Sequence, residues 1–201
     1  MTHTSLIAVD LVLLLPPLLI RSIVKLNRRL KSPPEGFLFD SDRLPHLTLV
    51  QQFVRETDLA ALDSLIKKRI HHHLPLQLHT TQLSSPRTAC TLGVTLSREL
   101  MTFHCQLMSD LLPFFVTTNV QNAVWAVPDI PRPADVQWVS KFRQDSAFDQ
   151  FNPHITVGIG TVEACVEPRS FVAATVALCH LGRFCTCRRV LKTWELTTRK
   201  S

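Results

Sequence analysis

The sequence predicts an α+β fold made of two related halves. Stretches with the alternating pattern of strands occur between stretches with the period of helices, and this order returns in a shorter form in the second half. A His-x-Thr tripeptide preceded by proline occurs once in each half, with its histidine at His46 and at His154, 154 − 46 = 108 residues apart. At 201 residues the chain is long enough for one sizeable domain. We therefore expect residues 1–201 to form a single domain with one motif in each half.

The first half is predicted to begin with a buried strand and an amphipathic helix. Residues 6–15 are almost entirely apolar, and Pro16 and Pro17 suit the first turn of a helix that ends near Lys31. Residues 11–20 also resemble the hydrophobic part of a signal peptide, but no Lys or Arg precedes them and the two prolines interrupt them. We therefore expect neither a targeting segment nor a membrane-spanning helix.

The later elements follow from the same periodicities. Thr57 and Ser97 are suitable caps for two of the helices, because their hydroxyls can accept hydrogen bonds from the first turn. The chain is expected to end in a hairpin around Gly182. In chain order, the expected elements are strands at 37–39 and 46–54, a helix at 58–72, strands at 76–83 and 88–96, helices at 98–112 and 134–142, and strands at 152–160, 171–180 and 186–196.

Both tripeptides lie in strand-like sequence, as PHLTL at 45–49 and PHITV at 153–157. Side chains two residues apart on a strand point to the same face, so each motif presents an imidazole beside a hydroxyl. One such histidine alone is more often structural, but the repeated context favours a catalytic pair. Two opposed imidazoles can deliver and remove a proton, while hydroxyls hold an anion between them. This is the chemistry needed to open a phosphodiester.

Charge and cysteine content restrict the partners and the compartment. Lys and Arg exceed Asp and Glu by 22 − 16 = 6, which favours anionic partners such as RNA ends or nucleotides. The six cysteines include no Cys-x-x-Cys pair and are typical of reduced thiols, so we expect an intracellular, cytoplasmic protein. The three consecutive histidines at 71–73 are not expected to bind a metal, because adjacent helical residues point in different directions.

With LPHLTL at 44–49 and FNPHITVG at 151–158, the sequence resembles the 2H phosphoesterase superfamily and, within it, the LigT-like or 2′,5′ RNA ligase-like family. The opening strand with its prolines and the final hairpin extend this resemblance over nearly the whole chain. The resemblance implies a two-lobed fold in which each lobe contributes one His-x-Thr strand to a central groove. Known members hydrolyse 2′,3′-cyclic phosphates, nucleotide-derived cyclic phosphates or 2′,5′ linkages without a metal, and some process RNA 3′ ends.

The resemblance therefore implies a metal-independent phosphodiesterase that opens 2′,3′-cyclic phosphates on RNA ends or small nucleotides. His46, Thr48, His154 and Thr156 are the expected catalytic residues. The residues alone leave the acid and the base unassigned, and the resemblance favours His154 as the base and His46 as the acid, an assignment that varies with the orientation of the substrate. We expect no cofactor, no membrane partner and a monomer. Two alternatives stay open, a nucleotide- or RNA-binding module of the same fold without turnover, and an exonuclease that trims RNA 3′ ends.

Four further residues are candidates for contact with the substrate. In the family the final hairpin borders the groove, so Phe184 could stack on a base and Arg183 could meet a phosphate. Arg87 is another candidate for phosphate, and Gly158 would let a substrate or another backbone come close. The alternative interpretation of the hairpin is that Arg183 is an ordinary surface charge and that Phe184 is a half-buried ring beside it. The chain has no Tyr, so any stacking falls to Phe or Trp.

Overall fold

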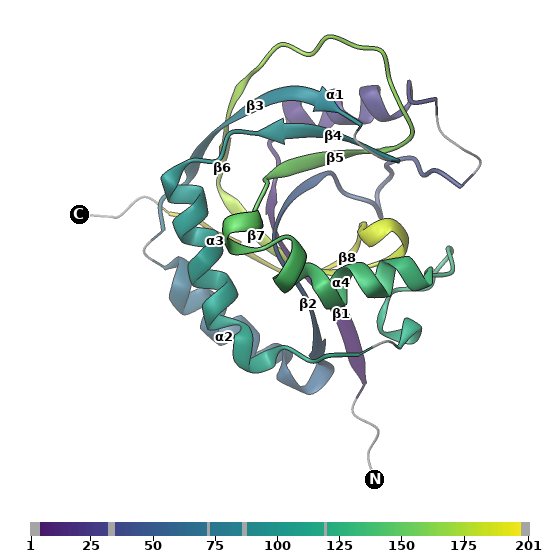
Figure 1. Ribbon diagram of the computed structural model, residues 1–201. Coiled ribbons are helices and arrows are strands. Elements are labelled where there is room, and N and C mark those ends of the chain that lie inside the picture. Colours follow the sequence, from purple (N-terminus) through teal and green to yellow (C-terminus); the bar gives the residue numbers. More distant parts are fainter. Residues whose placement is uncertain (1–4, 32–34, 72, 86–87, 119, 198–201) are drawn as a thin grey trace.

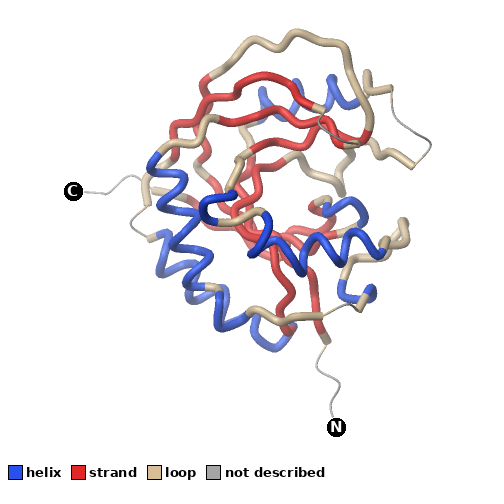
Figure 2. The backbone as a smooth tube through the Cα atoms, in the orientation of Figure 1, coloured by secondary structure: helices blue, strands red, loops and turns tan. Residues whose placement is uncertain are grey.

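The computed structural model describes residues 5–31, 35–71, 73–85, 88–118 and 120–197. Within these ranges, eight strands form one curled antiparallel sheet in the order β6-β3-β4-β5-β2-β1-β7-β8 (Figures 1 and 2). The strands are β1 (Leu6–Leu14), β2 (His46–Arg55), β3 (Leu76–Ser84), β4 (Ala89–Val94), β5 (His154–Ile159), β6 (Ser170–Ala173), β7 (Thr175–Leu181) and β8 (Cys187–Glu195). The α-helices are α1 (Pro17–Asn27), α2 (Leu59–Ile70), α3 (Arg98–Asp110) and α4 (Pro133–Asp145).

The sheet consists of two halves that meet where β2 lies beside β5. One half contains β6, β3, β4 and β5, and the other contains β2, β1, β7 and β8. Among the described residues, β2 and β5 pair only where Leu47 lies opposite Ile155, whereas β1 and β2 pair over nine positions. The predicted α+β fold with two lobes is confirmed, and each lobe contributes one motif strand to the place where the lobes join.

The prediction of a single strand at 171–180 is wrong. The chain forms two strands there, β6 and β7, which are separated by Ala174. β6 pairs with β3 near one end of the sheet order, and β7 pairs with β1 near the other end. The sheet therefore curls until strands from its two ends meet at Ala174. An alternating pattern cannot reveal this change of partner, because both strands have the same period.

Smaller differences concern helix ends and one short strand. Ser97 caps α3 as predicted, since its hydroxyl accepts a hydrogen bond from the backbone N–H of Leu100 at 3.1 Å. Thr57 does not cap α2 but lies inside a short 3₁₀ turn before it. Residues 37–39 form no strand, because their backbone groups bond to the side chain of Asn27 instead of a neighbouring strand.

Helices cover both faces of β1. Its odd-numbered residues from Ile7 to Leu13 belong to the main core, which also includes residues of α1, α2 and α3. On the opposite face, Ala8 packs with Phe53 of β2 and with Val136 of α4 (Figure 1). The apolar run near the start of the sequence is thus a buried strand, as predicted. In the described part of the chain, no helix combines the length and the hydropathy that crossing a bilayer requires.

Candidate active site

Strands β2 and β5 bring the two motifs to one face of the sheet. Because the middle residues of the motifs lie opposite each other in an antiparallel pair, this register places His46 opposite Thr156 and Thr48 opposite His154. Side chains in such positions share a face, about 4.5–5.5 Å apart when directly opposite and about 7–8 Å apart on the diagonal. The four side chains thus form the corners of a rectangle, with the two imidazoles on one diagonal and the two hydroxyls on the other. The four predicted catalytic residues therefore lie on one face of the sheet, around the pair of Leu47 and Ile155.

The same hydrogen bond orients both imidazoles. Nδ1 of His46 lies 2.7 Å from the carbonyl oxygen of Leu44, and Nδ1 of His154 lies 2.8 Å from that of Asn152. A carbonyl oxygen only accepts, so each Nδ1 carries a hydrogen and donates it. Nε2 is then the nitrogen that gains or loses a proton in each ring.

Each motif strand also contains a β-bulge one residue after its threonine. In the pairing of β2 with β1 the extra residue is Leu49, and in the pairing of β5 with β4 it is Val157. Bulges bend a strand and change the direction of nearby side chains, and they are common beside active sites. The two motif strands thus share a β-bulge as well as the His-x-Thr sequence.

His104 of α3 supports the bulge in the first motif strand. This fully buried imidazole donates from Nδ1 to the carbonyl oxygen of Leu49 at 2.7 Å, and its Nε2 accepts from the backbone N–H of Phe148 at 3.0 Å. Its ring stacks on Phe151 with 3.8 Å between ring centroids. Burial lowers the pKa of His104 despite the bond to the Leu49 carbonyl, which favours the neutral ring that this pair of bonds requires. His104 therefore connects β2 with the segment that leads into the second motif.

Asn27, at the end of α1, supports the bulge in the second motif strand. Its buried amide donates to the carbonyl oxygens of Val157 at 2.8 Å and Phe37 at 3.1 Å, and it accepts from the N–H of Phe39 at 3.0 Å. Asn27 thus holds β5 beside the loop that leads to the first motif.

Gly158 makes room for the end of α1. A Cβ atom at this position would lie 2.5 Å from Cδ1 of Leu30 and 2.6 Å from Nδ2 of Asn27. The close approach predicted at this glycine does occur, but the side chains of α1 and the turn after it make it. Leu30 and Asn27 fill the space on this side of buried Gly158, and its assignment as a substrate contact stays a prediction.

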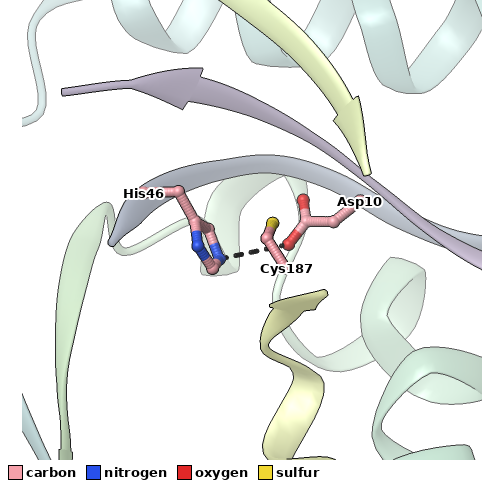
Figure 3. Close-up of side chains that lie close together, drawn as sticks. All are labelled: Asp10, His46 and Cys187. Carbon is pink, nitrogen blue, oxygen red and sulfur yellow. Dashed lines mark ion pairs between the residues drawn. The ribbon is translucent and has the colours of Figure 1, made fainter. Parts of the chain in front are cut away.

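Asp10 of β1, which the sequence did not single out, lies beside the first motif (Figure 3). Its Oδ2 lies 3.6 Å from Nε2 of His46, and it accepts from the hydroxyl of Thr48 at 2.8 Å and from Nε2 of Gln51 at 2.7 Å. Asp10 is fully buried, and the side chain of His46 is 11% exposed. The only signal in the sequence was one acidic residue inside an apolar run.

The surroundings of the two histidines differ. Burial disfavours the charged imidazole of His46, but the hydrogen bond and charge of Asp10, with the Leu44 carbonyl, outweigh it and raise the pKa of His46 above its usual value of 6.5. Among the described residues, no acidic side chain lies within ion-pair distance of His154. The site therefore pairs one imidazole held beside a carboxylate with one that is not.

A model of the 2′-5′ RNA ligase superfamily matches residues 16–178, which is most of the chain. The chain belongs to this superfamily. It is similar to E. coli LigT in complex with 3′-AMP, at 20% identity and a TM-score of 0.60, over 96% of this chain and 99% of that chain. It is also similar to TT0787 of Thermus thermophilus, at 12% identity and a TM-score of 0.61, over 94% of this chain and 98% of that chain.

A further similar structure is that of E. coli LigT in complex with NADP+, at 19% identity and a TM-score of 0.60, over 96% of this chain and 99% of LigT. At these identities the likeness concerns the fold. No sequence among curated proteins matches this chain. The resemblance to the LigT-like 2H family is thus confirmed by the family model and by the fold.

The final hairpin of this superfamily member lies beside the first motif, because Leu44 donates its N–H to the carbonyl oxygen of Cys187. Phe184 lies in the turn between β7 and β8, and the guanidinium of Arg132 lies 3.9 Å from the centroid of its ring. Arg183 pairs with Glu35 at 3.2 Å. A base stacking on this face of Phe184 would have to displace Arg132, and a phosphate at Arg183 would compete with Glu35. These two predicted contacts remain predictions.

Two positions of the sequence analysis lie outside the described residues. They are Arg87, the other predicted phosphate contact, and the middle histidine of 71–73.

Proposed function

We propose that this member of the 2′-5′ RNA ligase superfamily is a metal-independent phosphodiesterase that opens 2′,3′-cyclic phosphates at RNA 3′ ends or in small nucleotides. The observation that carries the proposal is the pair of imidazoles on one face, each with Nδ1 bound to a carbonyl, so that Nε2 is the nitrogen available for proton transfer. Only histidine offers both an acid and a base near neutral pH without a large change of pKa.

The different surroundings of the histidines support different roles. Nε2 of His154 would take a proton from water, and the resulting nucleophile would attack the phosphorus. His46, whose raised pKa favours the protonated form, would donate its Nε2 proton to the departing ribose oxygen. Asp10 thus acts as a positioning residue for the acid, because its buried carboxylate contacts His46.

The two threonines also differ in what they can do. A hydroxyl has one hydrogen, and that of Thr48 already donates to Asp10 at 2.8 Å. Thr48 could donate to a phosphate oxygen only after its hydroxyl turned away from the carboxylate. Thr156 is therefore the better candidate to donate to a non-bridging oxygen in the transition state.

We expect the protein to hydrolyse 2′,3′-cyclic nucleotides in the presence of EDTA, since the proton transfers need no metal. The measurement is chromatography of the products after incubation with each of the four cyclic nucleotides. Tight nucleotide binding without product would contradict the enzyme and support a binding module. A ladder of shortened products from an end-labelled RNA would instead support an exonuclease.

Replacing Asp10 with asparagine should move the alkaline limb of the kcat/KM profile to lower pH. The carboxylate raises the pKa of His46, so the neutral amide lets His46 lose its proton at lower pH, and activity then declines earlier as the pH rises. The measurement is kcat/KM against pH for both proteins. Asp42→Asn, a change at an exposed loop residue, is the control and should keep the wild-type profile. An unchanged limb in D10N would contradict the role of Asp10.

A further inference from the structure

Three potential metal ligands of different types converge at the first motif. A carboxylate oxygen of Asp10, a ring nitrogen of His46 and Sγ of Cys187 all lie within 4.8 Å of one another (Figure 3). Asp10 and Cys187 are buried, and the residues come from three strands, β1, β2 and β8. Carboxylate oxygen, imidazole nitrogen and thiolate sulfur are the donors that Zn²⁺ takes in proteins.

The distances require little movement to enclose an ion. Bonds of about 2.0–2.3 Å in a tetrahedral site place ligand atoms roughly 3.3–3.6 Å apart, and Nε2 of His46 already lies 3.6 Å from Oδ2 of Asp10. The sulfur would need to approach by at most about 1.5 Å. The hydrogen bond from Leu44 to the carbonyl of Cys187 holds the start of β8 beside the first motif, so the three ligands do not depend on a distant loop.

Unpartnered oxygens provide an independent indication of a cation. Oδ1 of Asp10 is buried and has no hydrogen-bond partner, although Oδ2 of the same group accepts from two side chains. The amide oxygen of Gln51, whose Nε2 donates to this carboxylate, is also buried without a partner. A buried oxygen without a donor is costly, and a cation bound to the Asp10 carboxylate would offset part of that cost.

We propose that Asp10, His46 and Cys187 form an inhibitory binding site for Zn²⁺ or another thiophilic divalent cation. On binding, the thiol of Cys187 releases its proton to solvent, the sulfur bonds to the ion, and no electron is transferred. The ion takes the lone pair of Nε2 in His46, which can then no longer carry a proton to the leaving oxygen. The inhibitory effect rests on the proposed function, whereas binding of the ion does not.

The binding test uses Co²⁺ as a spectroscopic substitute for zinc on the full chain. Wild-type protein freed of metal should develop a thiolate-to-cobalt charge-transfer absorption that Zn²⁺ abolishes by competition. Cys187→Ala should lose this absorption, and the matched control Cys90→Ala, at another buried free thiol in β4, should keep it. Asp10→Asn is the second variant and should weaken Co²⁺ binding with the thiol intact.

The activity test measures inhibition of cyclic-phosphate hydrolysis by Zn²⁺. Losing even an indirect partner of a metal site costs about 10- to 100-fold in affinity, so Cys187→Ala should need at least about tenfold more Zn²⁺ for half inhibition. No cobalt absorption in the wild type, or the same absorption in Cys187→Ala, would overturn the site. Cobalt absorption in a protein without any turnover would instead refute the proposed function and leave the site standing.

Discussion

Replacing either His46 or His154 with alanine should reduce hydrolysis of a 2′,3′-cyclic nucleotide about 10²- to 10⁴-fold, the usual effect of losing a general acid or base. The two rings lie on a diagonal of one sheet face, and only His46 lies beside a carboxylate, so neither can replace the other in its role. The double variant should be about as slow as the slower single variant, because acid and base act in one step. The measurement is kcat and KM for the three variants.

His79→Ala is the matched control for this experiment. His79 is exposed on β3 and bonds to Ser170, so its removal should leave kcat unchanged. Unfolding by denaturant, measured on every variant, separates a loss of chemistry from a loss of folded protein. Activity near that of the wild type in both single variants would refute the two-histidine mechanism.

Replacing Asn27 with alanine should lower the free energy of unfolding by about 3 kcal/mol or more. The substitution leaves the carbonyl oxygens of Phe37 and Val157 and the N–H of Phe39 without their partner in a buried place. Each unpaired buried group costs roughly 1–3 kcal/mol. Because the same side chain connects both motif segments, activity should fall even at temperatures where the variant is folded. Urea unfolding and steady-state kinetics measure the two effects.

Ser22→Ala provides the comparison on the same helix. Ser22 is half-buried, and the hydrogen bond of its hydroxyl runs back to the carbonyl of Leu18 in the same helix, so its loss should change the free energy of unfolding by no more than about 0.5 kcal/mol. A cost below about 1 kcal/mol for Asn27→Ala would mean that the surrounding backbone finds other partners, and that Asn27 does not fix the bulge.

Local sequence patterns were sufficient to predict the two motifs and most of the helices and strands. Alternation and helical period predict the strand and helix around each His-x-Thr sequence, because those signals come from neighbours in the chain. The partner of His46 was beyond their reach, since Asp10 meets it only through the pairing of β1 with β2 and the bulge at Leu49. A bulge has no reliable sequence signal. Without knowing where the bulge lies, one cannot count along the two strands to find which residues are opposite each other.

Gly158 illustrates a different limit. The sequence correctly indicates that something approaches this backbone closely, since only glycine leaves that space. Whether the space holds a substrate or a side chain depends on how α1 packs, and Asn27 gave no signal of its role. The turn at Ala174 was missed for a related reason, because the change of partner strand takes one residue with no proline or glycine.

The position of β1 between β2 and β7 has a consequence for synthesis on the ribosome. Val9 pairs with His180, 180 − 9 = 171 residues later in the chain, so one edge of this apolar strand stays without its partner until β7 has been made. Unpaired edges of apolar strands promote association between chains, and contacts of such long range slow folding. The nascent chain should therefore depend on chaperones for most of its translation, and the Asp10–His46–Cys187 corner is completed only when β8 follows β7.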